Sequence, residues 1–179
     1  MGVQMGNVAS KPKVTRIQAD FSAGDFVVYP THGVGKIVGL ESQQIAGYQL
    51  QVFVIDFEKD RMTLRVPIAK AKTSGLRRLS SRKEMQEALA RLKGRSRVRR
   101  TMWSRRAQEY EAKINSGDPA SIAEVVRDLH RNSGQPDQSY SERQMYEAAL
   151  ERLADELALV EKIDRDAATQ KLESMLKAA

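Results

Sequence analysis

Hydrophobic and polar positions change their period once along the chain, near residues 75–81. Before this point, apolar residues form short runs separated by Gly, Pro and polar turns, which is typical of β-strands. After it, they recur every three or four positions, which indicates amphipathic helices. The pattern predicts a β module followed by a helical module. Because no long linker separates the two modules, we expect them to pack together.

The first module should contain short strands over residues 25–29, 36–40, 48–57 and 62–66, with a fifth candidate over 76–79. Strands this short and closely spaced favour a small antiparallel barrel. In the fourth strand Met62, Leu64 and Val66 share one face. Thr63 and Arg65 therefore point away from the core.

The third strand, 48–57, is apolar on both faces, because Phe53 and Ile55 alternate with Val52 and Val54. A strand buried on one side only would not need both sets. Either another element of the chain or a partner must cover the face that carries Phe53 and Ile55, and of the two we expect the following helices to cover it.

The second module should contain five helices. Capping boxes at Ser81–Glu84 and Ser139–Glu142 begin the first and fourth helices, and Asp118–Pro119 begins the third. The second helix is expected over about 101–116, and Asp164 should cap a last helix that ends near Leu176.

Charge is unevenly distributed. Residues 81–107 carry ten basic and two acidic side chains, whereas residues 108–179 carry nine basic and fifteen acidic ones. The stretch Arg95–Arg106 holds six arginines, no acid and Trp103, the only tryptophan. Guanidinium groups bind phosphates in a fork, and an indole ring stacks on a base or wedges between two. A focused basic patch of this kind favours nucleic-acid binding.

Trp103 also has a structural interpretation. Trp103, Ala107, Tyr110 and Ile114 fall on one helical face, and this periodicity by itself favours a core position for the ring. The residues alone leave both interpretations open.

The chain has no cysteine, its two histidines are far apart, and the motifs of a zincin, a nucleophile elbow or a P-loop are missing. We therefore expect no catalytic site, no metal and no cofactor. No apolar run approaches a membrane span, and the N-terminus lacks the apolar core of a signal peptide. The expectation is a cytoplasmic, nucleoid-associated monomer with a disordered tail over residues 1–20.

Several segments resemble the CarD and CdnL family of bacterial transcription regulators. The stretch Gly24–Gly35 reads Gly-Asp-Phe-Val-Val-Tyr-Pro-Thr-His-Gly-Val-Gly, and Leu64–Pro67 reads Leu-Arg-Val-Pro. In the second half, Trp103–Arg106, Ala123–Leu129 and Glu156–Leu159 are similar to the same family. The resemblance covers roughly residues 21–176, and the order and spacing of the motifs make it specific.

The resemblance implies a Tudor-like or SH3-like module over residues 21–80 that binds the RNA polymerase β subunit. It also implies a helical module over 81–179 that contacts double-stranded or forked promoter DNA, largely independently of sequence, and stabilises the open complex. Trp103 would be a wedge in the minor groove at the upstream edge of the bubble. Arg105 and Arg106 would contact DNA beside this wedge. The preceding run of Arg95, Arg97, Arg99 and Arg100 is more basic than the family pattern, and we expect these four side chains to contact phosphates.

The same resemblance makes Arg65 a polymerase contact, with Thr63 and Gln43 beside it. Some family members have arginine where this chain has Gln43, so the chain departs from the family pattern there. The alternative function is an RNA- or ribosome-binding factor built on an SH3-like barrel, because the Gly-Asp-x-Val-Val stretch is also similar to those barrels. Such a factor would use aromatic platforms on exposed strands, whereas the aromatic and arginine cluster here lies in the helical half.

Overall fold

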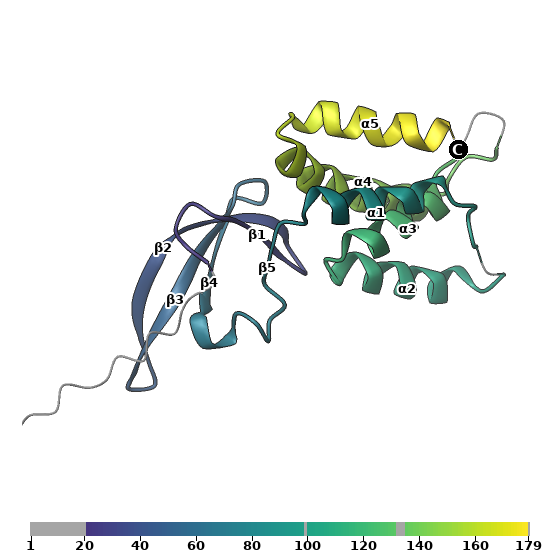
Figure 1. Cartoon of the computed structure of the whole chain (residues 1–179). Coiled ribbons are helices and arrows are strands. Elements are labelled where there is room, and N and C mark those ends of the chain that lie inside the picture. The colour runs from purple at the N-terminus through teal and green to yellow at the C-terminus, as the bar shows by residue number, and fades with distance from the viewer. Residues whose placement is uncertain (1–20, 99, 132–134, 179) are drawn as a thin grey trace, which may run out of the picture.

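The computed structural model describes residues 21–98, 100–131 and 135–178. A five-stranded antiparallel sheet is followed by a helical module (Figure 1). The strands are β1 (Phe26–Tyr29), β2 (Gly33–Ile45), β3 (Tyr48–Phe57), β4 (Met62–Pro67) and β5 (Arg77–Arg78). The helices are α1 (Arg82–Ala90), α2 (Trp103–Asn115), α3 (Pro119–Leu129), α4 (Tyr140–Glu161) and α5 (Arg165–Lys177), with short 3-10 helices η1 (Ile68–Lys70) and η2 (Arg91–Lys93). The predicted fold class is confirmed, whereas the predicted tail over residues 1–20 lies outside the described residues.

The strands lie in the order β4-β3-β2-β1-β5. β2 is longer than the predicted 36–40, because its polar second half pairs with β3 as far as the Ile45–Tyr48 pair. Ala46 and Gly47 connect the two strands, with φ angles of 52° and 81°. Positive φ at both central residues is typical of the tight hairpin turn that matches the twist of paired strands.

The face of β3 that carries Phe53 and Ile55 is buried within the β module itself. The two side chains are 1% and 0% exposed, in a cluster drawn from residues 21–76. Phe21 packs edge-on against Phe53, with 5.8 Å between the ring centroids. The prediction that the helices cover this face is therefore wrong, because residues before β1 and after β4 close over it instead.

The helices α1, α3, α4 and α5 begin where the sequence predicts. The side-chain oxygens of Ser81, Asp118, Ser139 and Asp164 accept backbone N–H groups in the first turns of α1, α3, α4 and α5. The apolar stripes of these helices meet in one core cluster. Such caps satisfy N–H groups that have no partner inside the helix.

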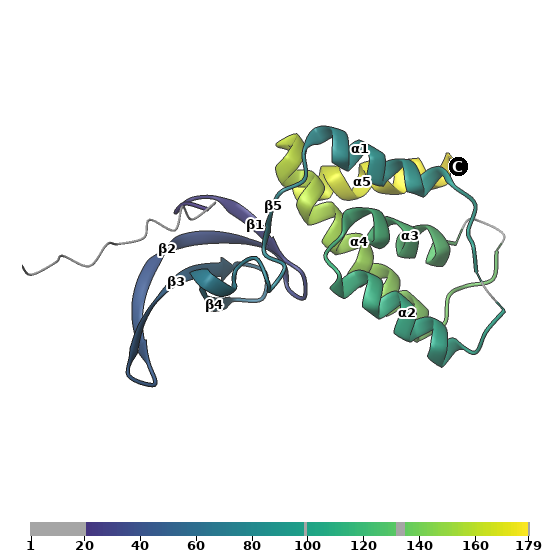
Figure 2. The same cartoon turned by 60° about the horizontal axis from the view of Figure 1, so that its bottom comes forward.

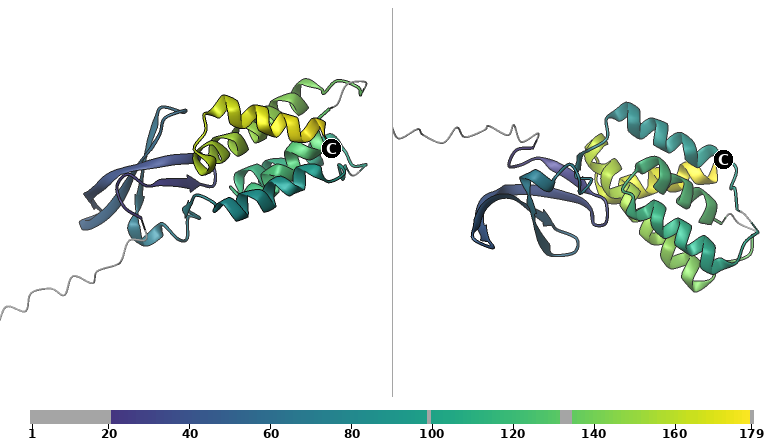
Figure 3. Two further views of the ribbon diagram at one scale, coloured as in Figure 1. Left: turned by 45° about the horizontal axis from the view of Figure 1, so that its top comes forward. Right: turned by 90° about the horizontal axis from the view of Figure 1, so that it is seen from below.

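The two modules lie end to end and touch through β5 and α4 (Figure 2), and the further views in Figure 3 show the same arrangement. Arg77 on β5 forms two hydrogen bonds to the Glu156 carboxylate on α4, at 2.7 and 2.9 Å. Glu156 is 4% exposed. A Cβ atom on Gly117 would lie 2.8 Å from the Cα of Pro30, so the backbones of the two modules are in close contact there. The expected packing between the modules is confirmed.

Candidate nucleic-acid interface

The arginine segment lies between η2 and α2, at the end of the helical module that faces away from the sheet (Figures 1 and 2). The side chains of Arg95, Arg97, Arg100 and Arg105 are exposed. Arg99, which is expected to contact a phosphate, lies outside the described residues. The predicted helix over 101–116 begins at Trp103, two residues later than expected.

A buried carboxylate holds this segment in place. Asp128, near the end of α3, is 4% exposed. Its Oδ1 atom accepts the backbone N–H of Arg97 at 3.1 Å and the Nε–H of Arg127 at 3.0 Å. The contact fixes the backbone of the basic segment against the module. Sequence reasoning missed Asp128, because one acid next to an apolar stripe has no local signature of such a role.

Trp103 is the first residue of α2 and is partly buried against the helical core. The centroid of its ring is 6.3 Å from that of Tyr110. Met102, immediately before it, is 79% exposed. Trp103 thus packs partly against the core and also lies at the exposed start of α2. Its position agrees in part with the core interpretation and in part with the nucleic-acid interpretation of the sequence.

Arg106 is not an outward-facing side chain. It is partly buried, and its guanidinium carbon lies 5.4 Å from the centroid of the Trp103 ring and 5.8 Å from that of Tyr110. Its Nε and Nη2 atoms are inaccessible and have no hydrogen-bond partner within the described part of the chain. Cation–π attraction compensates only partly for the missing hydrogen bonds.

A pocket of about 720 Å³ adjoins Arg106 and Arg97 and is lined by α2, α3 and the end of α1. Glu124 in this pocket accepts hydrogen bonds from Arg91 at 2.6 Å and from Lys113 at 2.9 Å. The hydrogen bond from Lys113 holds the pKa of the Glu124 carboxyl below its usual range, against the opposing effect of burial. Glu124 therefore remains an anion that is already engaged by two cations.

The implied polymerase residues lie on the sheet. The Nε atom of Arg65 on β4 donates to Glu41 Oε2 on β2 at 3.1 Å, and both side chains are about half exposed, at 45% and 49%. Thr63 donates to Asp56 at 2.8 Å. Gln43 is partly exposed and shares a face with Glu41, because alternate residues of a strand point the same way. Sequence reasoning did not find Glu41, which is contributed by a different strand.

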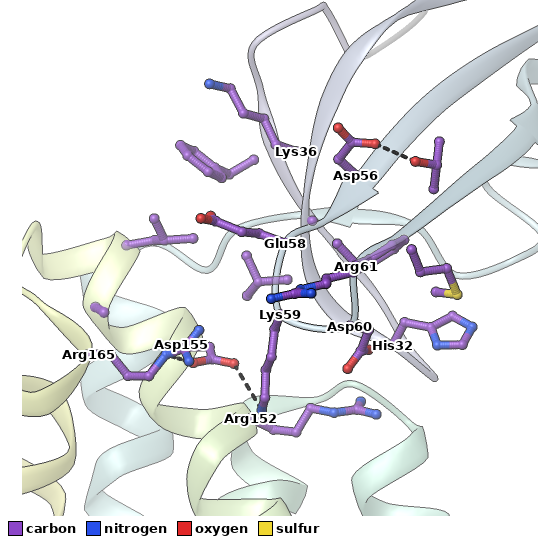
Figure 4. Close-up of a pocket in the computed structure, with 18 of the residues that line it drawn as sticks. His32, Lys36, Asp56, Glu58, Lys59, Asp60, Arg61, Arg152, Asp155 and Arg165 are labelled. Carbon is purple, nitrogen blue, oxygen red and sulfur yellow. Dashed lines mark hydrogen bonds and ion pairs between the residues drawn. The ribbon is translucent and has the colours of Figure 1, made fainter.

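A second pocket, of about 740 Å³, lies between the modules (Figure 4). Side chains of both charges line it. Asp155 on α4 pairs with Arg165 at 2.7 Å and with Lys59 at 3.8 Å. Burial raises the pKa of the Asp155 carboxyl, and the Lys59 and Arg165 charges oppose this effect. Burial likewise lowers the pKa of the nearby Arg152 guanidinium, whose Nη1 donates to the Pro30 carbonyl at 3.0 Å. The Lys59–Asp155 pair and the hydrogen bond from Arg152 to Pro30 therefore connect the two modules.

Among the described residues, no group of three or more His, Cys, Asp or Glu side chains is arranged to hold a metal ion. In the same part of the chain, no helix has both the length and the apolar character needed to cross a membrane.

Comparison with known proteins identifies the family. The profile of the CarD-like/TRCF RID domain matches residues 21–80, and that of the CarD C-terminal domain matches residues 87–173. The chain belongs to the CarD family. Its sequence is 30% identical over 143 residues to "Putative transcription factor YdeB" of Bacillus subtilis (strain 168), which covers 80% of this chain and 94% of that protein.

The CarD-family chain is also similar to the solved structure "CdnLNt from Myxoccoccus xanthus". The two are 35% identical over 36% of this chain and 92% of that chain, with a TM-score of 0.31. The two family profiles and the match to YdeB confirm the resemblance seen in the sequence motifs, and the family is one of transcription factors. The match to the RID domain indicates an interaction with RNA polymerase in general.

Proposed function

We propose that this chain is a non-catalytic transcription regulator that binds the RNA polymerase β subunit through its sheet and stabilises the promoter open complex through its helical module. Arg65 anchors the polymerase contact, with Thr63 and Gln43 beside it. Trp103 is the wedge at the upstream edge of the bubble. The exposed arginines near it hold the neighbouring phosphates.

The observation that carries this proposal is the position of Trp103. Its ring is partly packed at the first turn of α2, and Arg100 and Arg105, which lie on either side of it in the sequence, have exposed side chains. A ring that packs partly against the core keeps its orientation when its exposed edge inserts between two base pairs. The arginines beside it supply the phosphate contacts that position such a wedge without reading bases.

Binding to DNA should be weak, salt-sensitive and largely independent of sequence. The stretch 95–106 contains no Asn or Gln, the side chains that pair with adenine in the major groove. Each phosphate contact contributes about 0.9 to the slope of log affinity against log salt concentration. Arg105→Ala should therefore flatten the slope by about 0.9 if Arg105 holds one phosphate.

The decisive experiment combines a pull-down with the isolated polymerase β subunit and the lifetime of a promoter open complex. The wild-type chain should be retained by the β subunit and should lengthen the lifetime. Arg65→Glu should lose both effects, whereas Trp103→Ala should lose only the second. A chain that is not retained by the β subunit and leaves the lifetime unchanged would overturn the proposal.

One observation favours a second candidate, an RNA-binding factor. Tyr48 at the β2–β3 hairpin is 73% exposed and Phe26 on β1 is 40% exposed, so the sheet offers aromatic rings to a partner. Exposed aromatic rings on strands are the platforms on which single-stranded bases stack. A gel shift that compares forked DNA with single-stranded RNA separates the candidates, because the proposed regulator should prefer the forked DNA.

A further inference from the structure

Positive and negative groups in the pocket beside the arginine segment do not balance. Five cations and three acids line it. Two of the acids, Glu124 and Asp128, are engaged by Arg91, Lys113 and Arg127. The third acid is Glu109, whose side chain is exposed. Arg97 and Arg106 also line the pocket. Neither guanidinium pairs with a carboxylate in the ranges that the structure describes, and the lining as a whole carries two more positive than negative charges.

The unpaired donors of Arg106 have a particular geometry. Nε and Nη2 lie on one edge of the guanidinium, and both are buried without a hydrogen-bond partner among the described residues. This edge is the one that grips two oxygens of a carboxylate or phosphate in a fork. Burying hydrogen-bond donors without partners is strongly unfavourable. A state in which these two donors of Arg106 find an acceptor is therefore favoured over the position of Arg106 against the rings.

The position of Arg97 adds the second half of the site. Its backbone is tied to Asp128 at 3.1 Å, which keeps Arg97 at the edge of the pocket. Arg106 reaches the same pocket from α2. An oxyanion between them would meet two guanidinium groups without displacing any ion pair that the described residues form.

We propose that Arg97 and Arg106 form a binding site for one phosphate group in this pocket, and that Arg106 leaves its place against Trp103 and Tyr110 to bind it. The phosphate belongs either to a DNA backbone or to a free phosphorylated molecule. In the first case the site deepens the proposed function, because phosphate binding and release of the Trp103 ring become one event.

The chain carries its own reporter for this site. Trp103 is the only tryptophan, and the Arg106 guanidinium lies 5.4 Å from the centroid of its ring. Removing a cation from the face of an indole changes the electrostatic environment of the ring. Trp103 fluorescence of the full chain should therefore change in a saturable way as the site fills.

The experiment titrates the full chain with sodium pyrophosphate, with inorganic phosphate and with a short duplex, against sodium chloride at matched ionic strength. The affinities of the variants are measured by isothermal titration calorimetry, because Arg106→Gln itself removes the cation that Trp103 fluorescence reports. Arg106→Gln should weaken the affinity by about tenfold or more, since a charge-assisted hydrogen bond is lost. Arg97→Gln should weaken it less. Lys83→Gln removes an exposed charge on α1 that does not line the pocket, so it should leave the affinity unchanged.

The outcomes separate this site from the wider proposal. A fluorescence change with the duplex alone assigns the site to a phosphate of the DNA backbone. A fluorescence change with pyrophosphate alone assigns the site to a free phosphorylated ligand. In that second case the polymerase pull-down still tests the proposed regulatory function independently. The site is refuted if no ligand changes the fluorescence of the wild-type chain, or if Arg106→Gln and Lys83→Gln bind the ligand with the same affinity.

Discussion

Arg65 on β4 reaches across β3 to Glu41 on β2, with 3.1 Å between Nε and Oε2. The register places Arg65 beside Val54 and Glu41 beside Val52, so the ion pair lies diagonally over the middle strand. The guanidinium proposed to contact polymerase is thus already held in position by a neighbouring carboxylate. This arrangement orients Arg65 before a partner arrives and limits the entropy lost on binding.

Arg65→Glu should abolish retention by the polymerase β subunit while the chain remains folded. The pair is about half exposed, and such pairs contribute about 0–1 kcal/mol, so stability should fall by no more than about 1 kcal/mol. The double variant Arg65→Glu with Glu41→Arg restores the ion pair with its charges reversed and serves as the control. Recovery of stability without recovery of binding would show that Arg65 acts on the partner, whereas recovery of both would contradict the assignment.

Trp103→Ala should have an intermediate cost in stability. A fully buried tryptophan replaced by alanine costs about 3–5 kcal/mol, and an exposed one costs little, so the partly buried ring should cost about 2 kcal/mol. Trp103→Phe keeps part of the packing and should recover part of the open-complex lifetime. Urea denaturation and the lifetime should be measured on both variants. Loss of lifetime in strict proportion to loss of stability would argue that Trp103 is structural only.

Glu156→Gln should loosen the joint between the modules. Its carboxylate accepts hydrogen bonds from Arg77 and from both the backbone and the side chain of Ser80. Breaking a buried ion pair leaves one charge without compensation, which costs about 3 kcal/mol. Glu151→Gln on the same helix is the control, because the Glu151 side chain is 43% exposed in its pair with Lys59 and should cost under about 1 kcal/mol. The free energy of unfolding of the full chain tests this, and similar losses in the two variants would contradict it.

Tyr146 should make stability depend on pH under alkaline conditions. Burial, with a smaller contribution from the charge of Glu173, raises the pKa of Tyr146 to about 12. In the unfolded chain the pKa of tyrosine is about 10. Because the folded state retains its proton to higher pH, this stabilisation is complete below pH 10 and is lost as pH rises toward 12.

Tyr146→Phe should therefore reduce the loss of stability between about pH 10 and 12. The comparison is between slopes, because the variant also loses the 3.2 Å contact with His130 at every pH. Tyr140→Phe, at a ring that is 76% exposed, should leave the slope unchanged. Equal slopes for Tyr146→Phe and the wild-type chain would contradict the prediction.

The sequence predicts the helix starts well, because a cap such as Ser139 acts on a backbone group only three residues away. It predicts the outward orientation of Arg65 for the same reason, since the alternation along one strand decides it. The second half of β2 was missed, because Glu41 and Gln43 are polar and become strand only through pairing with β3.

Long-range ionic contacts could not be predicted. Arg77 and Glu156 are 79 residues apart, and each resembles an ordinary surface charge in the sequence. The position of Arg106 beside two rings is likewise not predicted by periodicity. The third and fourth residues of α2 are both arginine, and only the packing against Trp103 and Tyr110 distinguishes Arg106 from Arg105. The charge pattern located the basic segment, whereas the fold decides which of its arginines is free.

The close approach of Gly117 to Pro30 has a consequence for protein engineering. Gly117 and Glu156 come from the helical module, while Pro30 and Arg77 come from the β module, so each side supplies half of the joint. A chimera that grafts either module onto a foreign partner would carry only one half, and any side chain opposite Pro30 would force the grafted halves apart. A graft of one module's binding surface therefore also needs the residues of the other module that form the joint.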